Sequence, residues 1–320
     1  MSAPASLQTL IGRYVVERRR LGFEATDALY LSSLARHLRS VKHKGPLTLE
    51  VMADWARRDS HGSQNPKTWA RRLKRLRTFT RWLQQFEPRT EVPDDLVFGS
   101  VGERLAPHIY TEAEIGDLLG AAGKLRPTLR GAVHRTLFGL MASTGLRISE
   151  AIGLTIADVD LKSGMLTIRQ SKFGKSRQVP VHSTTLEALR RYRRQRDLYT
   201  GANPEFPFFI GTRGRRLGQG LSDRQVHRVF AEIRRQLRWR NRGAHHAPRI
   251  HDLRHSFVVH RILRWQDESV DIDQAMLQLS TYVGHTTVTN TYWYLSAVPE
   301  LVAKTAKKFK PLFRTEVAHA

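Results

Sequence analysis

The chain has 320 residues, enough for about two domains of ordinary size, and 40% hydrophobic residues supply core material for both. This composition excludes a disordered chain. The 53 Lys and Arg residues exceed the 29 Asp and Glu residues by 24, which predicts a polyanionic partner, with nucleic acid favoured over membrane. The absence of cysteine excludes disulfides, thiolate zinc ligands, iron–sulfur clusters and a thiol nucleophile.

The start of the chain carries no targeting pattern. Residues Met1 to Leu10 lack the basic and then apolar run of a signal peptide, and no window approaches ~18 uninterrupted apolar residues. We therefore expect a cytoplasmic protein without membrane contact. The excess of basic residues is spread over both halves of the chain, so both halves are expected to face the polyanion.

The first part of the chain is expected to be helical. Apolar residues recur every three or four positions from Leu7 to Val15, from Leu29 to Leu38, from Leu49 to Trp55 and from Pro66 to Phe86. Proline and glycine then interrupt any helical period, which predicts a linker at residues 88–107. We expect an N-terminal helical, DNA-binding domain at residues 1–87.

The DNA-binding expectation rests on the last of these helices. One of its faces is apolar, and the remainder is basic with no acidic partner: Lys67, Arg71, Lys74, Arg75, Arg77 and Arg81. A solvated face is the alternative. Like charges without a counter-charge repel one another, so contact with phosphates is favoured, through Lys67, Arg71, Lys74 and Arg75.

The chain after the linker is expected to be mostly helical around a small antiparallel sheet. Thr111 and Glu114 have the spacing of a capping box and open a helix through Leu119. Further helices are predicted at Thr128–Ser143, Leu186–Leu198, Asp223–Trp239, His251–Trp265, Asp273–Leu279 and Val288–Leu295. Strands are predicted at Met165–Arg169 and Arg177–Val181, with a third candidate at Asp158–Leu161. The fold class is therefore mainly α with a small antiparallel β-sheet (α+β), in two domains.

An ordered set of polar motifs runs through the second domain. It consists of T-G-L-R-I-S-E (Thr144 to Glu150), Lys172 in the turn between two strands, H-D-L-R-H (His251 to His255), V-G-H (Val283 to His285) and Tyr294. None of these is a strong signal alone, because an isolated arginine is mostly a surface residue and an isolated tyrosine mostly core. The set in this order resembles the tyrosine recombinases, the family of phage integrases and Xer-type resolvases, over about Thr111 to Leu301.

The resemblance implies a catalytic domain at residues 108–300 that cleaves and rejoins DNA without metal or cofactor. It implies that five residues surround a scissile phosphate, namely Arg147, Lys172, His251, Arg254 and His285, while Tyr294 attacks it. Planar guanidinium groups suit the charged equatorial oxygens of such a phosphate. His251 and Arg254, three positions apart at a helix start, share one face where an anion is favoured.

The resemblance also suggests how protons move. A phenol has a pKa near 10, so it needs a proton acceptor, and a neutral imidazole such as His251 suits that task. Lys172 is expected to protonate the leaving 5′-oxygen, and His285 to hydrogen-bond a non-bridging oxygen. Glu150 is expected to orient Arg147.

Some assignments have close competitors. Tyr292 lies two residues before Tyr294, and Lys175 shares the turn of Lys172. The family form K-x-x-K-x-R places the catalytic lysine first, which favours Lys172 and leaves Lys175 and Arg177 as DNA contacts. The interval from Arg254 to His285 is longer than in compact members of the family, and the surplus near residues 265–273 is expected to lengthen a surface loop.

The resemblance further implies the partners. They are a double-stranded DNA recombination site held between the two domains as in a clamp, three further protomers in a homotetramer on two sites, and an accessory DNA-binding protein in some systems. Strand exchange would pass through a Holliday junction and serve a mobile element or replicon resolution. The tail at residues 301–320 would dock on a neighbouring protomer. A type IB topoisomerase and a non-cleaving DNA-binding regulator are the alternative functions.

Overall fold

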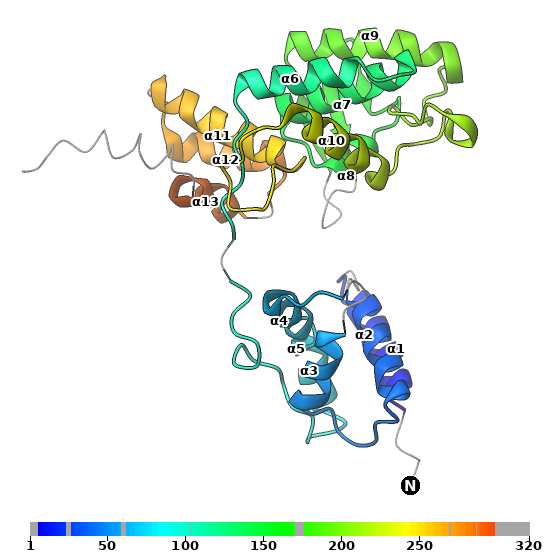
Figure 1. The fold of residues 1–320 in the computed structure, drawn as a ribbon, viewed down its shortest axis with the longest axis vertical. Coiled ribbons are helices and arrows are strands. Elements are labelled where there is room, and N and C mark those ends of the chain that lie inside the picture. The colour runs from blue at the N-terminus through cyan, green and yellow to red at the C-terminus, as the bar shows by residue number, and fades with distance from the viewer. Residues whose placement is uncertain are drawn as a thin grey trace, which may run out of the picture. The chain divides into compact units, whose positions relative to one another are not determined.

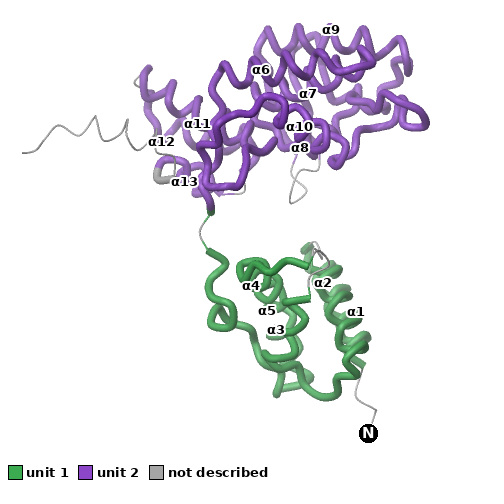
Figure 2. Tube along the Cα trace, in the orientation of Figure 1, with its two compact units in different colours: residues 1–104 green, residues 105–320 purple. Residues whose placement is uncertain are grey.

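The computed structural model describes residues 6–23, 27–58, 62–102, 104–169, 176–268, 270–285 and 287–297. The chain divides into two compact units, Met1–Arg104 and Leu105–Ala320 (Figure 2). Within the described residues, every helix is too short or too polar to cross a membrane. The functional division into a DNA-binding domain at 1–87 and a catalytic domain at 108–300 stays a prediction.

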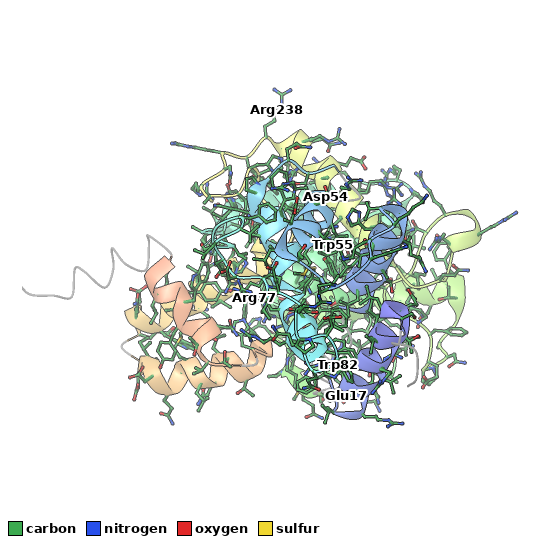
Figure 3. All side chains as sticks on the ribbon, turned by 90° about the horizontal axis from the view of Figure 1, so that it is seen from below. Glu17, Asp54, Trp55, Arg77, Trp82 and Arg238 are labelled. Atoms are coloured by element: carbon green, nitrogen blue, oxygen red, sulfur yellow. The ribbon has the colours of Figure 1, made fainter. Side chains whose placement is uncertain are left out.

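Helices are the only regular elements in the described part of unit 1 (Figure 1). Its helices are α1 (Leu7–Arg20), α2 (Ala28–Ser40), α3 (Leu49–Arg57), α4 (Pro66–Lys74) and α5 (Arg77–Leu83). The residue before α1, α3 and α4 is Ser6, Thr48 and Asn65, and each side chain accepts a hydrogen bond from the first turn. The core gathers Leu31, Leu34, Met52, Trp55 and Phe79. Trp82 of α5 donates from Nε1 to Glu17 of α1 at 3.0 Å (Figure 3).

The single helix predicted from Pro66 to Phe86 is wrong, because the structure divides it into α4 and α5. The N–H of Leu76 donates to Leu73 O, three residues back, at 2.9 Å. Such a tightened turn brings residues three apart onto one face. Leu73, Leu76 and Phe79 therefore all enter the core, each at most 1% exposed.

The segment predicted as a linker lies against unit 1 over much of its length. Glu91 donates its N–H to Leu47 O at 2.8 Å. Val97 and Phe98 pack against the core, and Arg77 Nε donates to Pro93 O at 2.7 Å. Apolar side chains after the prolines thus keep the chain on this unit up to residue 104.

Unit 2 surrounds a three-stranded sheet with helices, which confirms the fold class (Figure 1). The helices are α6 (Glu112–Gly123), α7 (Thr128–Thr144), α8 (Ile148–Ile152), α9 (Ser183–Thr200), α10 (Asp223–Leu237), α11 (Asp252–Asp267), α12 (Ile272–Val283) and α13 (Thr289–Ala297), with a 3₁₀ turn at Gly214–Arg216. The strands β1 (Val159–Asp160), β2 (Met165–Ile168) and β3 (Arg177–Pro180) pair antiparallel in that order. The predicted capping box at Thr111 and Glu114 is confirmed, with both hydrogen bonds present.

The described part of unit 2 has two clusters of buried apolar residues. The larger one is centred on α7, where Leu137, Phe138 and Met141 are fully buried. The smaller one joins α11, α12 and α13. The surplus residues near 265–273 extend α11 to Asp267 and leave a short connection before Ile272, so the expected long loop is wrong.

Because unit 1 has its own core, we expect a fragment of residues 1–104 to unfold cooperatively in urea. Trp55 is 1% exposed, so Trp55→Ala should lower the free energy of unfolding by about 3–5 kcal/mol through reduced burial and a residual cavity. Leu96 is 88% exposed, so Leu96→Ala should change it by less than about 0.5 kcal/mol. A fragment that unfolds without cooperativity would contradict an independent core.

Candidate active site

Three arginines from distant parts of the sequence meet at the carbonyl end of α12. In each case a guanidinium nitrogen donates to a main-chain oxygen: Arg147 to Gly284 at 2.9 Å, Arg254 to Val283 at 2.7 Å and Arg177 to Tyr282 at 2.9 Å. The last carbonyls of a helix lack partners within it and carry the negative end of its dipole. The V-G-H turn is therefore the place where these segments are joined.

Gly284 shapes that turn. Its φ of +69° lies in the left-handed region, which glycine adopts without a steric penalty. A Cβ at this position would lie 2.6 Å from Arg177 Nη1. The next residue, His285, donates its N–H to Ser280 O at 2.9 Å, and its Nδ1 lies 2.7 Å from Thr291 Oγ1 on α13. The turn thus holds His285 beside the arginines and ties it to α13.

Glu150 lies directly on Arg147, the residue that it was predicted to orient. Arg147 precedes α8 and donates from its main-chain N–H to Glu150 Oε2 at 2.9 Å and from Nη1 to Oε1 at 2.8 Å. Burial alone would raise the pKa of Glu150, but hydrogen bonds from Arg177 and from the Arg147 amide bring that pKa below its ordinary value. The carboxylate is therefore ionised at neutral pH and fixes Arg147.

Arg177 does not lie where a DNA contact requires it, which corrects the sequence-based assignment. Its side chain is 11% exposed, and its guanidinium makes four hydrogen bonds within the protein. Two of them go to Glu150 and two to the end of α12. The sequence pattern K-x-x-K-x-R places this arginine next to a basic turn, but β3 directs it inward.

The start of α11 supplies His251 and Arg254. Arg254 is 2% exposed and donates from Nη1 to Gly145 O at 2.6 Å, so it joins the α7–α8 turn to α11. Burial and the charge of Arg147 lower the pKa of Arg254 to about 9, which still leaves it charged at neutral pH. Gly145 has φ +64°, and a Cβ there would lie 2.6 Å from Phe257 Cδ1.

His251 presents one side to solvent while neighbouring groups crowd the other. Desolvation by those groups, followed by the charges of Arg254 and Arg249, lowers the pKa of His251 to about 4. The imidazole is therefore neutral at pH 7. A neutral imidazole can accept a proton, as the sequence-based assignment requires.

Tyr294 lies on α13 with its side chain fully buried. Its hydroxyl oxygen is 2.6 Å from Nδ1 of His255, which is itself 3% exposed. Sequence reasoning missed His255, although it belongs to the H-D-L-R-H motif. The available signal was its position four residues after His251, on the same helix face, where the two rings lie 4.8 Å apart.

Tyr292, the competitor of Tyr294, points elsewhere. Its hydroxyl donates to Asp273 Oδ1 at 2.7 Å, and this hydrogen bond raises the pKa of Tyr292 above its ordinary value. Two positions apart on a helix, the two side chains face different neighbours. Lys172 and Lys175 lie outside the described residues; the strands β2 and β3 flank them, with Ile168 paired to Arg177.

The basic residues of α4 are less uniform than the sequence suggested. Lys67, Arg71 and Lys74 are exposed and have no acidic partner among the described residues. The expectation of no acidic partner is wrong for Arg75, which pairs with Asp27 at 2.9 Å, and for Arg77, which pairs with Asp95 at 2.6 Å. Both carboxylates come from other segments, so the sequence of the helix alone could not show them.

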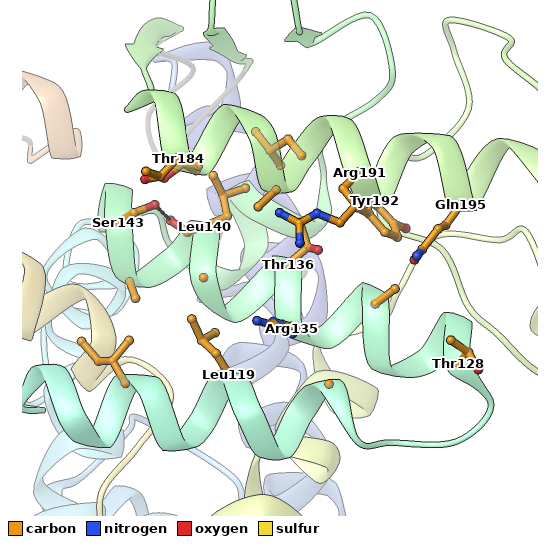
Figure 4. Close-up of a pocket in the computed structure, with 18 residues that line it drawn as sticks. Leu119, Thr128, Arg135, Thr136, Leu140, Ser143, Thr184, Arg191, Tyr192 and Gln195 are labelled. Carbon is orange, nitrogen blue, oxygen red and sulfur yellow. Dashed lines mark hydrogen bonds between the residues drawn. The ribbon is translucent and has the colours of Figure 1, made fainter.

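A cavity of about 540 Å³ lies between α6, α7 and α9 (Figure 4). Its walls include Leu119, Leu140 and Tyr192, with Arg135 and Arg191 at its polar positions. None of the candidate site residues that the structure describes lines it. The arginine cluster at the end of α12 is thus distinct from this cavity.

The sequence matches the model of the Phage integrase family over residues 109–300. It is also 34% identical over 312 residues to an integrase/recombinase of Sinorhizobium fredii (strain NBRC 101917 / NGR234), with 96% of this chain and 98% of that protein covered. The chain belongs to the phage integrase family. It is a tyrosine recombinase, an enzyme that cleaves and exchanges DNA strands at specific sites.

Solved structures share the fold of this integrase-family chain. XerH site-specific recombinase bound to palindromic difH substrate, a post-cleavage complex, has a TM-score of 0.62 at 20% identity, over 95% of this chain and 84% of that one. A lambda integrase tetramer bound to a Holliday junction has a TM-score of 0.59 at 18% identity, over 89% and 79%.

The state of His251 is directly measurable by NMR of isotope-labelled histidine. Because desolvation by neighbouring groups and nearby positive charges disfavour the imidazolium, we expect this ring to stay neutral as the pH falls to about 5.5 and to protonate near pH 4, whereas an ordinary histidine titrates near 6.5. His251→Gln identifies the signal. Arg249→Gln, which removes one cation, should raise the midpoint; a wild-type midpoint near 6.5 would contradict the description of the site.

Proposed function

We propose that Tyr294 of this recombinase attacks the scissile phosphate, forms a 3′-phosphotyrosyl bond and frees a 5′-hydroxyl. A 5′-hydroxyl from the partner duplex then attacks that bond, which releases Tyr294 and rejoins the strand. The ester conserves the energy of the broken bond, so rejoining needs no separate energy source. The observation that carries this proposal is the convergence of Arg147, Arg254 and the His285 turn at one point, with Tyr294 on a helix packed beside them.

Each neighbouring group has a chemical task in this scheme. The equatorial oxygens gain negative charge in the transition state, and Arg147 and Arg254 would neutralise it, because fixed guanidinium groups act without reorganisation. His285 would hydrogen-bond a non-bridging oxygen. His251 would accept the phenolic proton, which its lowered pKa allows at neutral pH, and Lys172 would protonate the leaving 5′-oxygen.

The burial of Tyr294 sets a condition on this reaction. Its hydroxyl is inaccessible and lies against His255, one helical turn along α11 from His251. To attack DNA, the hydroxyl of Tyr294 must leave that position and move to the solvent-exposed side of His251. We therefore assign the buried position to the resting enzyme and expect α13 to shift when the site engages DNA.

We also propose the partners. Double-stranded DNA with a recombination site would be held as in a clamp, with Lys67, Arg71 and Lys74 of α4 on its phosphates. Four protomers on two sites would exchange strands through a Holliday junction, a state in which lambda integrase, a protein of the same fold, is a tetramer. The tail at 301–320, which lies outside the described residues, would dock on a neighbouring protomer. The enzyme would act in the cytoplasm, with an accessory DNA-binding protein where assembly needs one.

Replacing Tyr294 by Phe removes the nucleophilic oxygen and little else. Tyr294→Phe should bind DNA as the wild type does but form no covalent adduct with nicked DNA, which denaturing gels of labelled DNA would detect. Tyr292→Phe, the matched control, should still form the adduct. Peptide mapping of the DNA-linked fragment would place the nucleophile at Tyr292 if the two results were reversed.

The role of Lys172 can be isolated with a modified substrate. General-acid catalysis contributes roughly 10²–10⁴-fold only when the leaving group needs a proton. If sulfur replaces the bridging 5′-oxygen, the leaving thiolate needs none, so Lys172→Ala should cleave that strand at close to the wild-type rate while remaining nearly inactive on ordinary DNA. Arg147→Ala should stay slow on both substrates, because the equatorial charge is still unneutralised.

Lys175→Ala is the matched control for that experiment. It should cleave both substrates at near the wild-type rate. Rescue of Lys175→Ala by sulfur, without rescue of Lys172→Ala, would assign the acid to Lys175, and the absence of rescue in both variants would place the proton donor elsewhere.

The exposed basic residues of α4 predict a salt effect. Each neutralised phosphate releases condensed counterions, so the slope of log affinity against log salt should become shallower by roughly 0.9 for each phosphate that a variant no longer neutralises. Arg71→Glu with Lys74→Glu should weaken binding and flatten the slope but leave cleavage of saturated DNA unchanged. Arg36→Glu with Arg89→Glu makes the same charge change at other exposed positions of unit 1 and should weaken binding less. An equal weakening by both pairs would contradict direct contact by α4.

A further inference from the structure

Arg177 connects three parts of unit 2 that are far apart in the sequence. It is the first residue of β3 and is paired with Ile168 of β2 in the sheet register. From there its guanidinium reaches Glu150 on α8 with two hydrogen bonds of 3.0 Å and the end of α12 with two more, of 2.9 and 3.3 Å. The guanidinium of Arg177 therefore joins β3 to both α8 and the end of α12.

We propose that Arg177 is a positioning residue for strand cleavage: it acts through Glu150 on Arg147 and holds the turn that carries His285. This inference rests on the proposed function of Arg147 and His285. Arg177 itself touches neither DNA nor the reacting atoms in this scheme. Its effect on the reaction is exerted through the groups that it fixes.

The geometry of the carboxylate supports the first part. Each oxygen of Glu150 accepts from both arginines. Oε1 accepts from Arg147 Nη1 at 2.8 Å and from Arg177 Nη1 at 3.0 Å, and Oε2 accepts from the Arg147 N–H at 2.9 Å and from Arg177 Nη2 at 3.0 Å. A planar fork on both oxygens prevents rotation of the carboxylate, which a single ammonium cannot do. Arg147 is then presented in one orientation before DNA arrives.

The hydrogen bonds to α12 support the second part. Tyr282 O and Val283 O, the acceptors of Arg177, belong to the turn whose next carbonyl, Gly284 O, accepts from Arg147. Without Arg177, the carbonyl oxygen of Tyr282 would lose its guanidinium donor. Because this end of α12 is partly buried, the loss of that hydrogen bond would destabilise the turn. The close approach at Gly284, where a Cβ would lie 2.6 Å from Arg177 Nη1, shows how tightly the guanidinium fills this space.

The conservative variant Arg177→Lys separates positioning from DNA contact. It keeps the charge but loses the fork, so single-turnover cleavage of saturating site DNA should fall roughly 10–100-fold, the range typical of groups that orient others. DNA affinity and the salt slope should not change, whereas removal of a phosphate-binding group would flatten the slope by roughly 0.9. Unchanged cleavage, or a flattened slope, would overturn the proposal.

Arg169→Lys is the matched control. Arg169 lies at the other side of the same hairpin, pairs with Asp158 at 2.5 Å and is 64% exposed, so its replacement should leave cleavage unchanged. Melting temperatures of both variants should lie within a few degrees of the wild type. If Arg177→Lys does not fold, Arg177→Gln combined with Glu150→Gln removes both charges together and should give a folded enzyme with the same slow cleavage and unchanged DNA affinity; wild-type cleavage by that folded pair would overturn the proposal.

A double-mutant cycle tests the route through Glu150. Because one of the two effects of Arg177 passes through that carboxylate, the double variant Arg177→Lys with Glu150→Gln should lose less activity than the product of the two single reductions. Rate reductions that multiply in full would show that no part of the effect of Arg177 passes through Glu150 and would overturn the proposal.

The sulfur-substituted substrate tests whether the effect reaches Arg147 or the lysine turn. Arg177→Lys should remain slow on it, as Arg147→Ala does, while Lys172→Ala recovers. If sulfur restored cleavage by Arg177→Lys, the effect would belong to the turn that carries Lys172, and the proposal would be overturned. A covalent adduct formed by Tyr294→Phe would instead overturn the proposed function, so the two failures are distinguishable.

Discussion

The proposed active centre depends on the carbonyl end of α12. Three guanidinium groups carry like charges and would repel one another, but the last turn of α12 offers each of them a main-chain oxygen at 2.7–2.9 Å. Glu150 adds a buried carboxylate between Arg147 and Arg177. Because these partners belong to the protein, the positive charge that a phosphate requires is assembled before DNA binds, and binding needs little reorganisation energy.

Tyr294, the proposed nucleophile, is attached to this centre in a different way from the arginines. Arg147 follows α7 and stands on the large core cluster, whereas Tyr294 belongs to the small cluster of α11, α12 and α13. The hydroxyl of Tyr294 lies against His255, and α13 is joined to the His285 turn through Thr291. A shift of α13 would therefore disturb little of the larger core, on which Arg147 stands. Arg147 and Tyr294 thus rest on separate clusters, whereas the carbonyl end of α12 shares the small cluster with Tyr294.

The sequence predicted most of the elements well, because each carries a local signal. The capping residue Thr111 indicates the start of a helix, and the glycine before His285 indicates a helix end in the left-handed conformation. Apolar residues spaced three or four positions apart indicate the helices themselves. Arg177 and Arg75 were misjudged since their partners, Glu150 and Asp27, lie 27 and 48 residues away, and no local pattern states which arginine a folded chain turns inward. The contact of Tyr294 with His255, 39 residues earlier, is tertiary in the same sense.

The net charge of +24 overstates the positive charge that this chain can offer to DNA. Arg254 and Arg196 are almost fully buried and donate to main-chain oxygens, and Arg196 also pairs with Asp197 at 2.6 Å. Such arginines raise the formal charge without facing a phosphate. Others, such as Arg75 and Arg242, are paired with carboxylates. The number of phosphates neutralised must therefore be smaller than a count of basic residues suggests, since a guanidinium that is committed to a carbonyl or carboxylate within the fold releases few counterions from DNA. The arginines of this chain therefore have two uses, binding of DNA phosphates and internal hydrogen bonding. The planar guanidinium group suits both, because it can donate to phosphates and equally to helix ends and carboxylates inside the protein.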